Sequence, residues 1–210
     1  MTVTNFQASL LDERRVRGAL SPLPLRQRLV LSDNAWVDLL PGCVNRSDEL
    51  FLRLVDTVPW YAEKRQMYDR VVDVPRLLSW YGEGDELPDP LLACAREALS
   101  EYYRGELGEP FRPAGLCYYR DGRDSVAWHG DTIGRSRTQD TMVAILSLGA
   151  ARKLMLRPRR AGPSLGFPLG RGDLIVVGGS CQRTWEHAIL KTARAVGPRI
   201  SVQFRPRGVR

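Results

Sequence analysis

The sequence has no apolar run that approaches the roughly 18 residues a helix needs to cross a membrane. Its first 30 residues alternate Arg, Asp and Glu with Leu, so they also lack the apolar centre of a signal peptide. We therefore expect a cytoplasmic protein with no membrane partner. A length of 210 residues suits one sizeable core. We expect a single domain, residues 1–210, and a monomer.

Cysteine and lysine are also scarce. The four cysteines form no Cys-x-x-Cys pair and stand among apolar neighbours, which disfavours a zinc knuckle or a disulfide framework and favours buried, reduced thiols. Only three lysines are present, so arginine carries nearly all of the positive charge. Residues 151–210 hold 13 basic residues against two acidic ones, an imbalance that favours an anionic partner, with nucleic acid first.

Histidine is the scarcest of the metal-binding residue types, with two in the chain. His129 stands two residues before Asp131, and His187 follows Trp185-Glu186. Residues two apart on a strand share a face, so His129 and Asp131 can meet at one ion that His187 completes from a later strand. Two histidines and one carboxylate form the facial triad of non-haem Fe(II) sites. Zinc, or histidines that bind no metal, are the alternatives.

A strand near the C-terminus favours iron chemistry over these alternatives. In residues 199–205, alternation places four polar residues on one face, namely Arg199, Ser201, Gln203 and Arg205. Unpaired guanidinium groups are costly inside a sheet structure. A small dicarboxylate beside the metal would pair with both arginines through bidentate hydrogen bonds.

The secondary structure that the sequence predicts changes near residue 112. Before it, the clearest patterns are helices among loops, with one helix capped by Ser47, another opened by Asp89-Pro90, and a strand at 36–40. After about residue 115, short β-rich runs alternate with Gly, Pro and Arg, at 116–120, 142–148, 153–157, 174–177 and 200–204. This predicts a mainly β protein in which N-terminal helices pack on an antiparallel sandwich or barrel.

These residues resemble the AlkB family of Fe(II)- and 2-oxoglutarate-dependent dioxygenases. The resemblance rests on His129-x-Asp131, on His187 and on the strand that begins Pro198-Arg199-Ile200-Ser201. It extends to two upstream motifs, Tyr119-Arg120-Asp121-Gly122-Arg123-Asp124-Ser125-Val126 and Val74-Pro75-Arg76-Leu77-Leu78-Ser79-Trp80-Tyr81-Gly82. The resemblance implies a double-stranded β-helix, or jelly roll. Residues 113–206 would form the catalytic core, and residues 1–112 an N-terminal extension with a nucleotide-recognition segment at about 60–82.

The resemblance also implies roles for individual residues. His129, Asp131 and His187 would hold Fe(II), and 2-oxoglutarate and O2 would be co-substrates. Arg199 and Tyr119 would bind the distal carboxylate of 2-oxoglutarate, and Arg205 would lie near its metal-proximal end and Asp131. Cys117 and Ser201 would line the same pocket, although many members carry Asn at both positions. The residues after Asp131, Thr132 and Ile133, also depart from DNA-repair members, which commonly carry an acidic residue there.

The implied reaction is oxidative demethylation of N-alkylated nucleobases, of the 1-methyladenine or 3-methylcytosine type, in DNA or RNA. It releases formaldehyde and succinate. The base must come from a single strand or be extruded from a duplex and held by stacking. We expect the substrate contacts to be Tyr68, Arg70, Trp80 and Tyr81. The same iron chemistry on a protein side chain or a free nucleotide remains an alternative, as does a catalytically silent nucleic-acid-binding module.

Overall fold

The computed structural model describes residues 20–67, 69–131 and 135–209. Within these residues, the strands form two antiparallel sheets. The larger sheet has eight strands in the order β1-β2-β10-β7-β12-β5-β4-β3. They are β1 (Gln27–Val30), β2 (Ala35–Leu40), β10 (Asp173–Gly179), β7 (Val143–Gly149), β12 (Arg199–Pro206), β5 (Phe111–Tyr119), β4 (Arg70–Tyr81) and β3 (Tyr61–Met67).

The smaller sheet has four strands in the order β6-β11-β8-β9. They are β6 (Val126–His129), β11 (Trp185–Ile189), β8 (Arg152–Pro158) and β9 (Leu165–Leu169). One apolar cluster joins the two sheets, with Ile145 and Ile175 from the large sheet and Leu154 and Leu156 from the small one. Two facing antiparallel sheets confirm the prediction of a mainly β, jelly-roll fold.

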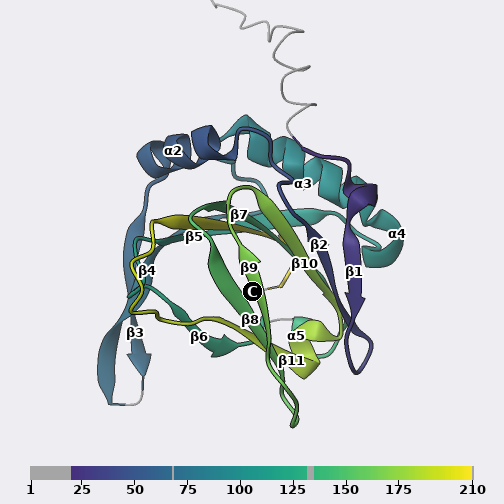
Figure 1. Cartoon of the computed structure of the whole chain (residues 1–210). Coiled ribbons are helices and arrows are strands. Elements are labelled where there is room, and N and C mark those ends of the chain that lie inside the picture. The colour runs from purple at the N-terminus through teal and green to yellow at the C-terminus, as the bar shows by residue number, and fades with distance from the viewer. Residues whose placement is uncertain (1–19, 68, 132–134, 210) are drawn as a thin grey trace, which may run out of the picture.

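Helices cover the other face of the large sheet (Figure 1). A second apolar cluster fills this layer, so β7 and β10 are buried on both faces and read as nearly continuous apolar runs. The helices of this layer are α2 (Ser47–Thr57), α3 (Pro90–Tyr102) and α4 (Arg104–Leu107). The remaining short turns are η1 (Leu23–Leu25), η2 (Arg135–Arg137) and α5 (Cys181–Thr184).

The predicted start of one helix is confirmed and that of the other is corrected. Asp89 caps α3, because its side chain accepts a hydrogen bond from the N–H of Leu91, and Pro90 occupies the first turn. Ser47 does not cap α2. The cap position belongs to Arg46, whose left-handed backbone (φ 56°) turns the chain into the helix, and Ser47 is the first helical residue. Its side chain is buried against the turn at Gly172.

The first half of the chain contains more strand than its local patterns indicate. Within residues 60–82, the expected nucleotide-recognition segment, the described strands β3 and β4 pair as an antiparallel hairpin. Through β4, this hairpin pairs with β5, so it extends the large sheet at its edge. The large sheet therefore draws strands from both sides of residue 112, where the predicted extension and core meet. That division stays a prediction.

The helices and the cysteines of the described chain have the following properties. In the part of the chain that the structure describes, no helix is both long and apolar enough to span a membrane. All four cysteines are free thiols, and Cys43, Cys117 and Cys181 are buried.

Candidate metal and co-substrate site

Three predicted metal ligands meet where the paired strands β6 and β11 of the small sheet carry the two histidines. His129 ends β6, His187 lies opposite it on β11, and Asp131 follows two residues after His129. Their ligand atoms all lie within 4.8 Å of one another, and the two imidazole rings are 4.2 Å apart at their centroids. Three side chains at this spacing fit a single divalent ion and leave coordination positions open for other ligands.

The charge states of these groups suit a metal. Burial opposes the ionisation of Asp131, but Arg205 and the two imidazoles outweigh it and lower the pKa of Asp131 to about 2. Burial, together with His129, lowers the pKa of His187 to about 3. At neutral pH the site therefore offers a carboxylate and a neutral imidazole, which are the forms that bind metals.

The tautomer of His129 is fixed by its own strand. Its Nδ1 lies 2.8 Å from the carbonyl oxygen of Ala127, which can only accept a hydrogen bond, so Nδ1 carries the proton. Nε2 is then the nitrogen that a metal can use, and it lies 3.8 Å from Oδ1 of Asp131. A histidine that donates through one ring nitrogen and presents the other is typical of metal sites.

The predicted co-substrate residues lie on the interior face of two adjacent strands. Arg199 on β12 pairs with Tyr119 on β5, and Ser201 pairs with Cys117. All four residues are buried. Burial raises the pKa of Tyr119, so its phenol stays protonated and able to donate a hydrogen bond. The alternation of β12 thus produces the single polar face that the sequence predicts.

Arg199 has more hydrogen-bonding groups than its surroundings satisfy. It is 1% exposed, and its Nη2 donates to Oγ of Ser147 at 2.7 Å. Its Nε and Nη1 have no hydrogen-bond partner among the described residues, and burial lowers its pKa. A buried guanidinium without a counter-charge is costly, and a carboxylate that accepts two of its hydrogen bonds would remove that cost. The donor set therefore fits 2-oxoglutarate.

Arg205 connects this pocket to the metal-ligand cluster. Its Nε donates to Oδ2 of Asp131 at 3.0 Å, and its Nη2 donates to Oε1 of Gln203 at 3.2 Å. Gln203 in turn donates to Oγ of Ser201 at 2.8 Å. Asp131, Arg205, Gln203 and Ser201 therefore form one continuous polar chain.

Sequence reasoning missed three residues of this site. Ser147 lies within an apolar run and gives no local signal. Gln203 lies on the polar face that the alternation of β12 predicts, but the sequence pattern does not identify it as a site residue. Arg76, on β4, donates to the carbonyl of Ser125, and its Nε has no partner within the described part of the chain. Burial opposes its charge, but neighbouring Cys117 and Tyr119 raise its pKa, so Arg76 adds another cation to the pocket.

The structure separates the expected substrate contacts. Trp80 lies opposite Gly115, beside Arg205, and is 41% exposed. Tyr81, the next residue, faces the other way and packs on the helix-side core, so the structure does not bring it to the site. Arg70 begins β4, and Tyr68 lies outside the described residues.

A jelly roll that brings two histidines, an aspartate and inward-facing arginines together defines an Fe(II)- and 2-oxoglutarate-dependent oxygenase. Residues 39–205 match the model of the 2OG-Fe(II) oxygenase superfamily. Fe(II) is accordingly the metal of this enzyme, and 2-oxoglutarate and O2 are its co-substrates.

Proteins of similar sequence identify the family within this oxygenase superfamily. The chain is 30% identical to alpha-ketoglutarate-dependent dioxygenase alkB homolog 3 of Bos taurus, over 82% of this chain and 68% of the relative. It is 24% identical to the human DNA oxidative demethylase ALKBH2, over 76% of this chain and 68% of the relative. The solved structure of OsALKBH1 has a similar fold, with a TM-score of 0.56 at 14% identity, covering 81% of this chain and 97% of that one. The chain belongs to the AlkB family.

Proposed function

We propose that this enzyme oxidatively demethylates N-alkylated nucleobases, of the 1-methyladenine or 3-methylcytosine type, in DNA or RNA. One relative carries the name DNA oxidative demethylase, and the basic C-terminal third of the chain suits a polyanionic substrate. The observation that carries the oxygenase chemistry of this proposal is the buried, incompletely paired Arg199 on the same strand as Arg205, which contacts Asp131. That arrangement requires an anionic co-substrate next to the metal.

In this proposal each cluster has a role. His129, Asp131 and His187 hold Fe(II). Arg199 and Tyr119 bind the distal carboxylate of 2-oxoglutarate, Arg205 lies near its metal-proximal end and Asp131, and Ser201 and Cys117 line the same pocket. When bound, iron and 2-oxoglutarate would supply the activation of O2, of which one atom would enter succinate, with loss of CO2, and the other would enter the substrate methyl group. The hydroxymethyl product then loses formaldehyde and leaves the unmodified base.

The protein itself provides position and a dry environment. Apolar side chains from both sheets, such as Leu156, Val177 and Trp185, belong to the same buried cluster as Cys117 and Tyr119, and this cluster limits access of water to the pocket. Arg205 holds the carboxylate of Asp131, and the strand pair β6–β11 holds the two histidines opposite each other. Placement of the methyl carbon against this fixed cluster is what the fold adds to the chemistry of the iron.

A base must leave its stack to reach this site. Trp80, exposed beside Arg205, is the aromatic surface on which we propose that the base stacks. Arg70, the first residue of β4, and Tyr68, which lies outside the described residues, stay predicted contacts to the rest of the nucleotide. Tyr81 is left out of this set because it packs on the opposite face of the sheet.

The test uses protein reconstituted with Fe(II) without O2. O2, 2-oxoglutarate and a single-stranded oligonucleotide carrying 3-methylcytosine are then added, and both the oligonucleotide mass and succinate are measured. Loss of one methyl group with stoichiometric succinate is the expected result, and the Asp131→Ala variant is the control. Succinate without demethylation would contradict the proposed substrate and favour a protein side chain or a free nucleotide. Neither product, with iron bound, would favour a silent binding module.

A further inference from the structure

A buried glutamine links the two segments that supply the metal ligands. After β10, the chain makes the single helical turn α5 and then enters β11, which carries His187. Gln182 lies on this turn and is 1% exposed. Its Oε1 accepts a hydrogen bond from the backbone N–H of Asp131 at 2.9 Å. The turn before the strand of His187 therefore reaches the loop that follows His129.

Asp131 needs such a partner because it lies beyond the β-ladder. The pairing of β6 with β11 reaches His129, the last residue of β6. Two residues later, the buried backbone of Asp131 must be satisfied by other groups. Gln182 accepts from its N–H, and the hydroxyl of Ser136 donates to its carbonyl oxygen. The carboxylate of Asp131 is held separately by Arg205.

The packing of this loop leaves little room for an alternative path. A Cβ atom on Gly130 would lie 2.5 Å from the carbonyl oxygen of Gln182 and 3.3 Å from that of Trp185. The segment from His129 to Asp131 thus lies directly against α5. A shift of α5 would move the backbone that carries two of the proposed ligands.

The nitrogen of the Gln182 amide indicates that this side chain is not there for packing alone. Its Nε2 is buried and has no hydrogen-bond partner among the described residues. A buried amide with an unpaired N–H group is less favourable for stability than an apolar side chain of similar size. Gln182 is therefore poorly explained by packing, whereas its oxygen acceptor is used by Asp131.

We propose that Gln182 is a positioning residue that fixes the backbone of Asp131, so that its carboxylate faces His129 and His187 before the metal binds. This inference rests on the proposed role of Asp131 as a metal ligand. Residues that orient metal ligands typically change metal affinity about 10- to 100-fold when they are replaced. Gln182 acts through Asp131 and has no contact with the reacting groups.

The test measures binding of Co(II) alone, without 2-oxoglutarate or O2, by titration of its visible ligand-field spectrum. Gln182→Met keeps the side-chain size but removes the oxygen acceptor, and Gln182→Glu keeps an oxygen acceptor. Thr184→Val is the matched control, because it removes the hydroxyl that bonds to Ser180 within the same turn and does not touch Asp131. Thermal unfolding of each metal-free variant shows how much stability it has lost.

We expect Gln182→Met to weaken Co(II) binding about 10- to 100-fold and to change the spectrum. Gln182→Glu and Thr184→Val should stay near wild type. Wild-type affinity and spectrum in Gln182→Met would overturn the proposal. Equal losses in Gln182→Met and Gln182→Glu, or in Gln182→Met and Thr184→Val at equal loss of stability, would also overturn it. Wild-type Co(II) binding by Asp131→Ala would instead refute the metal site, whatever the Gln182 variants do.

Discussion

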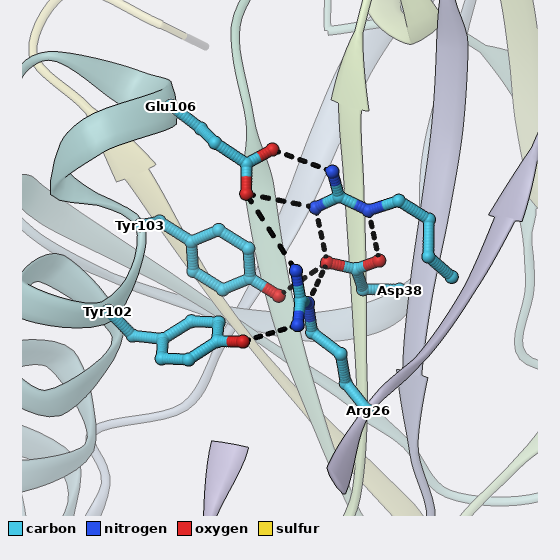
Figure 2. A network of polar contacts seen from close by, with 6 residues as sticks. Arg26, Asp38, Tyr102, Tyr103 and Glu106 are labelled. Atoms are coloured by element: carbon cyan, nitrogen blue, oxygen red, sulfur yellow. Dashed lines mark hydrogen bonds and ion pairs between the residues drawn. The ribbon is translucent and has the colours of Figure 1, made fainter. Parts of the chain in front are cut away.

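Two groups of arginines, one on each face of the large sheet, are paired very differently. On the helix side, Arg26 binds the carboxylate of Asp38 at 2.7 Å (Figure 2). Arg28 also binds this carboxylate at 2.7 Å and pairs with Glu106. The hydroxyl of Tyr103 donates to the carboxylate of Asp38 at 2.8 Å. On the interior side, Arg199 has one serine hydroxyl and two nitrogens without a hydrogen-bond partner in the described chain.

The pKa values of Arg28 and Arg199 shift in opposite directions, as the difference in pairing predicts. The hydrogen bond to Asp38 raises the pKa of Arg28, whereas burial lowers the pKa of Arg199. Protein carboxylates neutralise the first group, so it stabilises the fold by itself. On the interior face, Asp131 pairs with Arg205, but Arg199 has no protein carboxylate and needs an anion from outside the chain. The comparison shows that incomplete pairing of a buried charge, more than the number of arginines, marks the ligand site.

The largest expected effect is that of Asp131→Ala, because Asp131 belongs to the metal-ligand cluster and also contacts Arg205 of the co-substrate pocket. Replacing Asp131 by Ala removes a metal ligand and leaves Arg205 without its carboxylate. We expect iron-dependent succinate formation to fall by more than about 100-fold, beyond the usual effect of residues that only orient ligands. Iron content and turnover measured on the same sample check this, and retained turnover would refute the triad.

Arg199→Ala tests the incompletely paired arginine of the interior face. The loss of a buried charge pair with the co-substrate is expected to raise the 2-oxoglutarate requirement about 100-fold. The requirement for the oligonucleotide should change far less, because Arg199 contacts only the co-substrate pocket. Steady-state kinetics with each substrate varied in turn make the distinction. Equal changes in both requirements would count against the assigned role.

Asp38→Asn tests the helix side. It leaves Arg26 and Arg28 without their shared buried carboxylate, and we expect the free energy of unfolding to fall by about 2 kcal/mol. Turnover per folded molecule should not change, because Asp38 lies on the face away from the site. Chemical denaturation and activity of the same preparation check both parts. A change in the 2-oxoglutarate requirement would show that the two faces are coupled.

The stabilisation by Asp38 should also depend on pH. Burial opposes its ionisation, but the hydrogen bonds from Arg28, Arg26 and Tyr103 prevail and lower its pKa. A lowered folded-state pKa gives stability that is fully present above the unfolded value of about 3.9 and is lost as pH falls through the folded value. The stability difference between wild type and Asp38→Asn should therefore be constant from neutral pH to about 5 and shrink below about 4. Denaturation at several pH values measures it, and a difference that shrinks above pH 5 would contradict this assignment.

The smallest expected effect is that of Arg205→Lys. Lysine keeps the charge but cannot reach Asp131 and Gln203 together through a planar fork. We expect turnover to fall about 10-fold, with iron still bound. Wild-type kinetics would show that a point charge is sufficient at this position.

Local sequence patterns predicted those strands whose side-chain alternation lies within one short segment of the chain. The alternation of Arg199, Ser201 and Arg205 follows from a strand with one polar face, and the structure has that strand. The mainly β core was predictable for the same reason. The strand content of residues 60–82 was not, because β4 is completed by pairing with β5, a strand from another part of the chain.

Single polar residues were the hardest to predict. Ser147 and Gln182 lie in an apolar strand and a short turn, where no periodic pattern identifies them. Trp80 and Tyr81 were both expected at the substrate, although strand alternation places neighbouring residues on opposite faces. The structure brings only Trp80 beside Arg205.

The most direct test of the difference between the two arginine groups is thermal unfolding under anaerobic, metal-loaded conditions, with and without 2-oxoglutarate. At roughly 100 times its dissociation constant, 2-oxoglutarate should stabilise the wild type by about 3 kcal/mol. Arg199→Ala should be as stable as wild type without 2-oxoglutarate and gain little from it, whereas Arg28→Ala should be less stable and gain the full amount. Equal destabilisation of the two variants, with equal gains from 2-oxoglutarate, would contradict the account.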